Sequence, residues 1–272
     1  MIKKVGKGIG KGAVAVGKVA LKGVKYLAKT ENLIKIACAV LEYSGKSKDV
    51  YGLPNGNVLM VFKDLVTGIK GKEDPGANQV MGEKEGIGNK ALAMSSLIFD
   101  EISKHLKIPT QNIVTHLDAN ALEAKRAQMF GQGLEFISRN KAWGTFLERM
   151  KNYSQGDSLI SKFGVPYTEV SLKDDEKGDP FVTLDELLKL GTINEKDYQT
   201  CVDYLQRITI FLTEMFNQKK MELIDMKVEF GKDRNGNIML IDELSMGSLR
   251  ALINGEIASK EAIFEAFMKP QV

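Results

Sequence analysis

Cysteine and histidine are scarce in this chain of 272 residues, which has two of each. Cys38 and Cys201 show no Cys-x-x-Cys spacing, so the sequence indicates neither a disulfide framework nor a zinc site. His105 and His116 are too few for a histidine-based metal cluster. So few cysteines fit a reducing compartment, and we expect a cytoplasmic protein.

Long apolar runs are also missing at the N-terminus. Lysines interrupt every apolar stretch of the first thirty residues, which disfavours both a transmembrane helix and a signal peptide there. The segment has no arginine or serine, unlike an ordinary mitochondrial presequence. The whole composition, 43% hydrophobic and 27% charged, is typical of a globular protein with a sizeable core.

The positive charge is concentrated at the N-terminus. Eight lysines precede the first acid, Glu31, whereas the remaining 30 basic residues face 35 acids, so the body is mildly acidic. We therefore expect no nucleic-acid partner. Seven of these lysines recur at helical spacing, and two interpretations of residues 1–30 stay open. The segment contacts an anionic membrane surface, or it is a basic extension that is disordered or packed on the acidic body.

Two acids near the C-terminus, Glu229 and Asp242, flank an Asn-Gly pair at 235–236. This pair lies between two apolar runs and predicts a two-residue turn. Such a turn pairs Arg234 with Asn237 and places Glu229 directly opposite Asp242. Like charges ~5 Å apart repel, so we expect Mg²⁺ between them, with phosphates and water as its other ligands. The alternative is an edge hairpin with solvated charges.

Two lysines near residue 45 suggest a further phosphate contact. Lys46 and Lys48 follow Gly45 and fall on one face of a predicted strand, 44–51. Lysines beside a glycine can cover phosphates. The spacing is not a Walker motif, so a solvated strand remains the alternative. Lys227 lies two residues before Glu229, on the same strand face, where its ammonium reaches a phosphate.

Alternating strand and helix patterns predict an α+β fold of two lobes with a cleft between them. Further strands are predicted at 58–62, 113–117, 134–139 and on both sides of the 235–236 turn, and helices at 31–43, 89–107, 145–150, 183–190, 195–219 and 260–268. Residues 64–88, rich in Gly, Lys, Glu and Asp, predict a mobile loop. We divide the chain into a basic extension (1–40), an N-terminal lobe (41–125) and a C-terminal lobe (126–272).

Several short motifs occur in one order from about Ser44 to Arg250. They are Gly45 to Tyr51, Phe62 to Gly71, Ile108 to Thr110, Arg139 to Thr145, Lys173 to Pro180, Asp225 to Gly231, and Asp242-Glu243. In this order they resemble the phosphoribosylaminoimidazole-succinocarboxamide synthetase (SAICAR synthetase) family. The resemblance implies a two-lobed, protein-kinase-like ATP-binding fold. It also implies an enzyme of purine biosynthesis that uses ATP to join L-aspartate to carboxyaminoimidazole ribonucleotide.

Carried over by position, the resemblance assigns the nucleotide half of the site. Lys46 and Lys48 would contact ATP phosphates, and Glu229 and Asp242 would hold Mg²⁺. Lys227 would lie beside the transferred phosphoryl group.

The resemblance assigns the acceptor half in the same way. Arg139, Thr145 and Arg250 would receive the phosphate of the ribonucleotide, and Lys173 and Asp179 would line the same site as catalytic residues. The expected partners are small molecules, with a homo-oligomer as a further expectation.

The sequence departs from the family pattern near the acceptor. Lys70 stands where an Asn or Asp is usual, and the family's Ser-Pro-Asp is Ser245-Met246-Gly247. Two alternatives to the synthetase therefore stay open. One is a Mg-ATP-dependent kinase or ligase with a different acceptor, and the other is a non-catalytic homologue that acts through its basic N-terminus.

Overall fold

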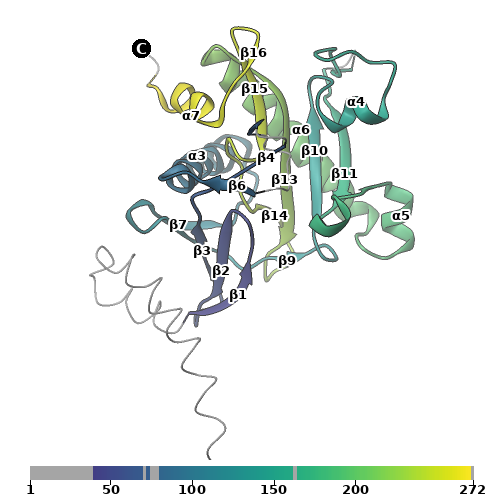
Figure 1. The fold of residues 1–272 in the computed structure, drawn as a ribbon. Helices are drawn as coiled ribbons and strands as arrows, with labels where there is room; N and C mark the ends of the chain where they lie inside the picture. Colours follow the sequence, from purple (N-terminus) through teal and green to yellow (C-terminus); the bar gives the residue numbers. More distant parts are fainter. Residues whose placement is uncertain (1–38, 70–71, 74–79, 162–163, 271–272) are drawn as a thin grey trace, which may run out of the picture.

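The computed structural model describes residues 39–69, 72–73, 80–161 and 164–270 (Figure 1). The lysine-rich segment and Lys70 lie outside the described residues. Over the ranges described, no helix is both long enough and apolar enough to cross a membrane. The helix predicted at 31–43 is wrong at its C-terminal end, where residues 40–44 form a strand.

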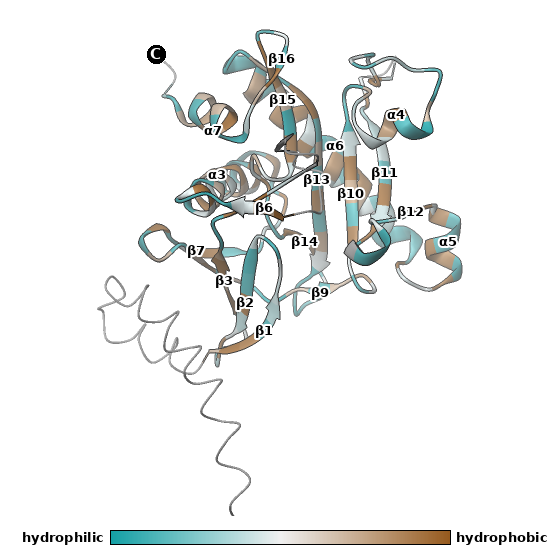
Figure 2. Cartoon of the chain, viewed as in Figure 1, coloured by the Kyte–Doolittle hydropathy of each residue, from teal (hydrophilic) through white to brown (hydrophobic). Residues whose placement is uncertain are grey.

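Five antiparallel strands form the sheet of the N-terminal half. Their spatial order is β1 (Val40–Ser44), β2 (Lys48–Gly52), β3 (Val58–Phe62), β8 (Ala121–Ala124) and β7 (Asn112–His116). Helix α3 (Ile87–Glu101) packs against this sheet and fully buries Leu92, Ile98 and Phe99. β3 is an unbroken apolar run, brown in Figure 2, and confirms the strand predicted at 58–62.

The segment predicted as a mobile loop contains a small sheet in the part that the structure describes. β4 (Leu65–Ile69) pairs with β5 (Lys72–Glu73) and with β6 (Val80–Glu83). Val66 anchors this sheet and is 6% exposed. The loop prediction was wrong here because glycines and charges outnumber the few apolar residues that make these strands. Two short turns of helix follow α3, at Ile102–Leu106 and Leu117–Ala119.

A larger sheet forms the C-terminal half. Its main path is β12 (Phe181–Val182), β11 (Tyr167–Leu172), β10 (Leu134–Arg139), β13 (Met221–Lys232), β15 (Leu249–Ile253) and β16 (Glu256–Ile257). β14 (Ile238–Ile241) and β9 (Gln128–Met129) also pair with β13. The helices of this half are α4 (Thr145–Arg149), α5 (Leu184–Lys189), α6 (Glu195–Gln218) and α7 (Lys260–Met268), with a 3-10 turn at Asp175–Lys177.

Helix α6 covers one face of the larger sheet (Figure 1). Phe136 of β10 packs against Tyr198 of α6 and Phe230 of β13, with ring centroids 6.1 and 5.4 Å apart. Side chains alternate along a strand, so the neighbours of Phe136 and Phe230 point to the opposite face. Glu135 and Glu229 therefore share the face that α6 does not cover.

The register of the β13–β14 hairpin corrects the sequence prediction by one residue. Glu229 pairs with Ile241 and not with Asp242. Asp242 is the first residue after β14 and has a left-handed φ of 67°. Strand alternation ends at this residue, and its carboxylate lies next to Lys48 of the other sheet.

The turn itself explains the shift in register. Asp233 N donates to Asn237 O at 2.9 Å, so the loop holds three residues, including Arg234, instead of two. The Asp233 carboxylate accepts hydrogen bonds from the backbone N–H groups of Asn235 (2.8 Å) and Asn237 (2.9 Å). Gly236 has a φ of 81°, the left-handed position that closes a three-residue hairpin.

Residues 109–111 of the N-terminal half pair with β14 of the C-terminal half. Leu240 N donates to Pro109 O at 2.9 Å, and Gln111 N donates to Leu240 O at 3.1 Å. The Gln111 side chain adds a bond from Nε2 to Asp242 O at 2.8 Å. We call this pairing the 109–111 seam; it joins the two halves directly beside Asp242.

Candidate active site

The uncovered face of the larger sheet carries a series of charged side chains. Its cross-strand pairs between β10 and β13 are Glu135 with Glu229, Ile137 with Lys227, and Arg139 with Asp225. β11 adds Ser171 opposite Glu135, and β15 adds Arg250 opposite Asp225. Four strands that are far apart in sequence thus contribute to one polar surface.

One end of this surface is a lysine cluster. It contains three lysines and three acids, namely Lys48, Lys173, Lys227, Glu135, Glu229 and Asp242. The ion pairs are Lys48 Nζ with Asp242 Oδ1 at 3.0 Å, Lys173 Nζ with Glu229 Oε1 at 2.5 Å, and Lys227 Nζ with Glu135 Oε1 at 2.5 Å. Lys48 is only 6% exposed and also lies 3.7 Å from Glu243 Oε2. The cluster is therefore shared between the two sheets.

The two acids predicted to hold Mg²⁺ have opposite pKa shifts. Burial and the negative charge of Asp242 raise the pKa of Glu229 to about 7, which Lys173 only partly opposes. Burial also disfavours the charge on Asp242, but Lys48 and Lys173 outweigh it and hold the pKa of this carboxyl below its usual range. Burial opposes the charge of the three lysines too, yet the surrounding acids raise the pKa of each, so all three stay charged.

The donor set fits a hard divalent cation. Glu229 Oε2 is buried and has no hydrogen-bond partner, while its other oxygen bonds Lys173. The Asp242 side chain keeps 26% of its surface exposed. Within the described residues, no group of three or more His, Cys, Asp or Glu side chains is arranged to hold a metal ion, and this site offers two carboxylates. Two carboxylates suit Mg²⁺ that takes its other ligands from phosphates and water.

The other end of the surface is an arginine cluster. Its members are Arg139, Arg149, Arg250, Asp225, Glu169 and Thr145. Asp225 Oδ2 accepts hydrogen bonds from Arg139 Nη1 at 2.7 Å and from Arg250 Nη2 at 2.6 Å. Arg139 Nη2 donates to Thr145 Oγ1 at 3.3 Å. The structure thus brings together the three residues predicted to receive a phosphate.

Glu169 orders the inner part of the arginine cluster. Its Oε1 accepts from Arg139 Nε at 2.8 Å and its Oε2 from Arg149 Nη2 at 2.6 Å. The Arg139 side chain is 3% exposed and that of Arg250 is 12% exposed, so Arg250 is the more accessible to a ligand. Gly144 has a φ of 57°, a left-handed backbone conformation that favours glycine. A Cβ there would lie 2.5 Å from Arg250 Nη1 and would force the guanidinium group to shift.

Lys46 lies in the turn before Lys48, and Asp179 lies close enough to Lys227 to affect its pKa. Gly45 N donates to Lys48 O at 2.9 Å and closes a turn that contains the half-buried Lys46. The strand predicted at 44–51 is confirmed for residues 48–51, which belong to β2, but is wrong at residues 45–47, where this turn separates β1 from β2. Lys46 therefore does not share a strand face with Lys48. Asp179 Oδ1 accepts from Asp174 N at 2.9 Å, and its charge helps to raise the pKa of Lys227.

Sequence reasoning did not single out Glu135, Glu169 or Ser171. A signal for Glu135 was present, because period-two alternation in the predicted strand 134–139 places it on the same face as Arg139. Glu169 and Ser171 belong to β11, which was not predicted. Their contribution depends on the pairing of β11 with β10, which no local pattern specifies.

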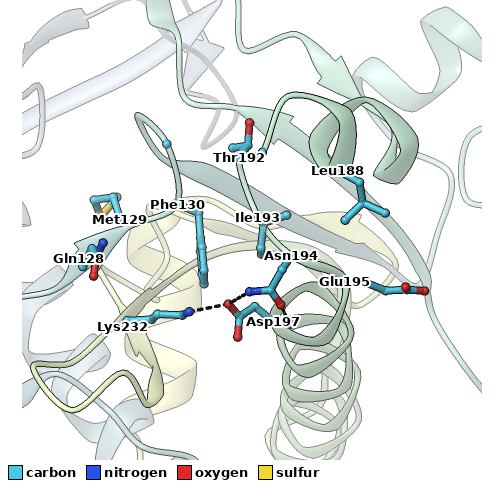
Figure 3. Close-up of a pocket in the computed structure, with 12 residues that line it drawn as sticks. Gln128, Met129, Phe130, Leu188, Thr192, Ile193, Asn194, Glu195, Asp197 and Lys232 are labelled. Atoms are coloured by element: carbon cyan, nitrogen blue, oxygen red, sulfur yellow. Dashed lines mark hydrogen bonds and ion pairs between the residues drawn. The ribbon is translucent and has the colours of Figure 1, made fainter.

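A separate pocket of about 650 Å³ lies at the start of α6 (Figure 3). Phe130 and Ile193 line it together with Lys232, whose ammonium pairs with Asp197 at 2.5 Å. The predicted site residues do not line this pocket.

The fold and the charged face define a two-lobed α+β protein with a candidate nucleotide site between its two larger sheets. A family model described as SAICAR synthetase matches residues 41–263, and the chain belongs to this family. The phosphoribosylaminoimidazole-succinocarboxamide synthase of Clostridium tetani is 41% identical over 215 residues, which cover 79% of this chain and 92% of that protein. The enzyme of the same name from Thermotoga maritima (strain MSB8) is 32% identical, covering 81% and 89%.

Solved structures agree with the family assignment. A SAICAR synthetase (type 2) in complex with ADP has a TM-score of 0.71 and 25% identity, and the match covers 83% of this chain and 93% of that one. The phosphoribosylaminoimidazole-succinocarboxamide synthase of Ehrlichia chaffeensis has a TM-score of 0.72 at 22% identity, covering 84% and 94%, and shows the same fold. The predicted α+β, SAICAR synthetase-like fold is confirmed.

Proposed function

We propose that this protein is an ATP-dependent ligase that joins L-aspartate to carboxyaminoimidazole ribonucleotide and releases ADP and phosphate. One observation carries the proposal. A site with two carboxylates and three charged lysines lies on the same sheet face as an arginine cluster in which Arg250 keeps 12% of its side chain exposed. The family assignment and the ADP complex of a related synthetase support ATP as the nucleotide.

The chemistry explains why both ends are needed. A carboxylate is a poor electrophile until one of its oxygens becomes a leaving group. An oxygen of the substrate carboxylate attacks the γ-phosphorus of ATP, the bond to the β-phosphate oxygen breaks, and ADP leaves. The aspartate amine then attacks the carbonyl carbon of the acyl phosphate, the carbon–oxygen bond to phosphate breaks, and the amine loses a proton. Excluding water protects the acyl phosphate from hydrolysis.

The lysine cluster suits the first step, because phosphoryl transfer relies on positioning and charge neutralisation. When bound, Mg²⁺ held by Glu229 and Asp242 would neutralise phosphate charge. Lys48 and Lys46 would bind the ATP phosphates, and Lys227 would hold the transferred phosphoryl group.

The arginine cluster suits the acceptor. Arg250 presents a guanidinium group that can hold a phosphate ester through paired hydrogen bonds, and Thr145 adds a hydroxyl. Arg139 is 3% exposed and would act from behind Thr145, to which it donates a hydrogen bond. Lys173 belongs to the lysine cluster and the charge of Asp179 acts on Lys227, so both would line the space between the two reacting groups.

The direct test is product formation. Purified protein with ATP, Mg²⁺, L-aspartate and carboxyaminoimidazole ribonucleotide should yield the succinocarboxamide ribonucleotide, detected by chromatography and mass spectrometry. Omitting the aminoimidazole substrate is the control. Absence of product with intact Mg-ATP binding would reject this acceptor, and absence of Mg-ATP binding would favour a non-catalytic homologue.

A different acceptor is the second candidate, favoured by the loop before Arg250. Met246 and Gly247 occupy the positions of the family's Pro-Asp. A Cβ at Gly247 would lie 3.0 Å from Glu243 Oε1, so an aspartate there would require Glu243 to move. ATP consumption measured across a panel of carboxylates and sugar phosphates separates the two candidates.

For residues 1–30 we propose peripheral contact with an anionic membrane by a protein otherwise in the cytoplasm. The lysine spacing supports this contact. The full-length protein should co-sediment with vesicles that contain phosphatidylserine but not with phosphatidylcholine vesicles. Equal sedimentation with both, or with neither, would reject it.

A further inference from the structure

We propose that Glu135 is a positioning residue that holds the ammonium group of Lys227 in place for phosphoryl transfer. This inference rests on the proposed function of the lysine cluster. Lys227 Nζ lies 2.5 Å from Glu135 Oε1, and the side chains are 34% and 5% exposed, respectively. Glu135 is therefore a buried carboxylate that fixes the partly exposed ammonium group of Lys227.

The Glu135 carboxylate is itself held in place by a second hydrogen bond. Ser171 Oγ donates to Glu135 Oε2 at 2.9 Å, so each carboxylate oxygen of Glu135 has its own partner. The three residues come from the adjacent strands β11, β10 and β13. A chain of hydrogen bonds thus runs across the sheet from Ser171 through Glu135 to the Lys227 ammonium group.

The partners of Glu135 distinguish it from the predicted metal ligands. Both of its oxygens are engaged, whereas Glu229 has one buried oxygen without a partner. Glu135 and Glu229 are directly opposite in the register and are 4% and 5% exposed. Two buried like charges in a cross-strand pair oppose folding, so fold stability alone does not account for Glu135.

Holding Lys227 is a physical advantage because a lysine side chain is long and flexible. Its four-carbon stem has many rotamers, and holding the ammonium group in one place costs conformational entropy. An ammonium group fixed before the substrate arrives reduces the ordering required during the reaction, and a displacement of about 1 Å can slow a reaction by about 100-fold. Glu135 therefore acts through Lys227 and not by contact with the reacting atoms.

The central test is Glu135→Gln, which keeps the shape and removes the charge. Turnover should fall by about 10- to 100-fold. Mg-ATP affinity, measured by titration calorimetry without acceptor, should stay the same or become tighter, because a carboxylate near the phosphates is removed. Weakening as large as that of Asp242→Asn would make Glu135 a metal ligand and overturn the proposal.

A double-mutant cycle tests whether Glu135 acts through Lys227. Lys227→Met should reduce turnover strongly, and Glu135→Gln should cause no further loss in that background. Effects that multiply would overturn the proposal. Ser171→Ala should cause a smaller loss, of about 2- to 5-fold, that disappears once Glu135 is replaced.

A matched control comes from the opposite face of the same strand. Ser138 is fully buried on β10, and its Oγ has no hydrogen-bond partner, so Ser138→Ala should leave turnover unchanged. Thermal melting of each variant checks folding. If the wild-type protein makes no succinocarboxamide product, the proposed acceptor fails. In that case, the effects of Glu135→Gln on Mg-ATP affinity and on the rate of slow ATP hydrolysis to ADP still test the role of Glu135.

Discussion

The lysine and arginine clusters lie on one sheet face but differ in charge balance. The lysine cluster matches three cations with three acids, and Glu243 adds a further acid beside Lys48. The arginine cluster sets three cations (Arg139, Arg149 and Arg250) against two acids (Asp225 and Glu169). One end is thus neutral or slightly negative, and the other has a cation in excess.

This difference in charge balance explains how the two clusters could each bind a different phosphorylated substrate. The arginine cluster can attract a phosphate ester without help, because its positive charge exceeds its negative charge. The lysine cluster offers no surplus cation, so a polyphosphate is attracted only if it brings a divalent cation to the two carboxylates. The same face would then select Mg-ATP at one end and a nucleotide monophosphate at the other.

The largest expected effect comes from Asp242→Asn. The change removes one of the two carboxylates proposed to hold Mg²⁺ and leaves Lys48 without its 3.0 Å ion-pair partner. Turnover should fall by on the order of 10²–10³, with weaker Mg-ATP binding. Calorimetry with the aminoimidazole ribonucleotide should show binding within about 2-fold of wild type. An equal loss at both ends would show that the clusters do not act separately.

Glu229→Gln should change how stability depends on pH. The folded-state pKa of Glu229 is raised, so its favourable contribution is complete below the unfolded value of 4.5 and is lost as pH rises through about 7. Metal-free wild-type protein should lose up to about 3 kcal/mol of unfolding free energy from this group between these pH values. Urea unfolding across the range should show a flatter profile for Glu229→Gln. Parallel profiles would contradict the raised pKa.

Arg250→Met should weaken the acceptor end selectively. Losing charge-assisted hydrogen bonds to a phosphate should raise the KM for the ribonucleotide by about 10- to 100-fold. The KM for ATP should change little, because Arg250 bonds Asp225 at the far end of the surface. Arg234→Met, in the exposed hairpin loop, is the matched control and should behave as wild type.

Thr145→Ala should have the smallest effect. The hydroxyl is exposed and its bond to Arg139 is 3.3 Å long, so the KM for the ribonucleotide should rise by about 2- to 5-fold. Steady-state kinetics with Thr145→Ser as the rescue variant provides the measurement. A change in kcat instead of KM would place Thr145 in the chemical step.

Local patterns predicted the strands and helices with strong periodicity. β3, β10, α6 and α7 were found where apolar residues repeat clearly, and an Asn-Gly pair located the β13–β14 hairpin. Its register was missed by one residue because the Asp233 cap lengthens the turn. Asp242 nevertheless lies in the lysine cluster, because its left-handed backbone departs from strand alternation.

The composition of the candidate site was harder to predict than its location. Lys48 and Asp242 come from different sheets, and their 3.0 Å contact depends on how the halves pack. Glu135 gains its partners only through the order β11–β10–β13, which is a long-range property of the fold. A sequence shows which residues are chemically suited to a site, but strand order decides which of them meet.

The 109–111 seam has a mechanical consequence. Three hydrogen bonds tie the N-terminal half to β14 and to the backbone of Asp242 itself. Swinging the halves apart as rigid bodies would break these bonds next to the Asp242 carboxylate. An opening motion that keeps these three bonds would leave the Asp242 backbone in place and would separate Lys48 from its 3.0 Å contact with the Asp242 carboxylate. Nucleotide exchange would then move Lys46 and Lys48 while the carboxylates stay fixed.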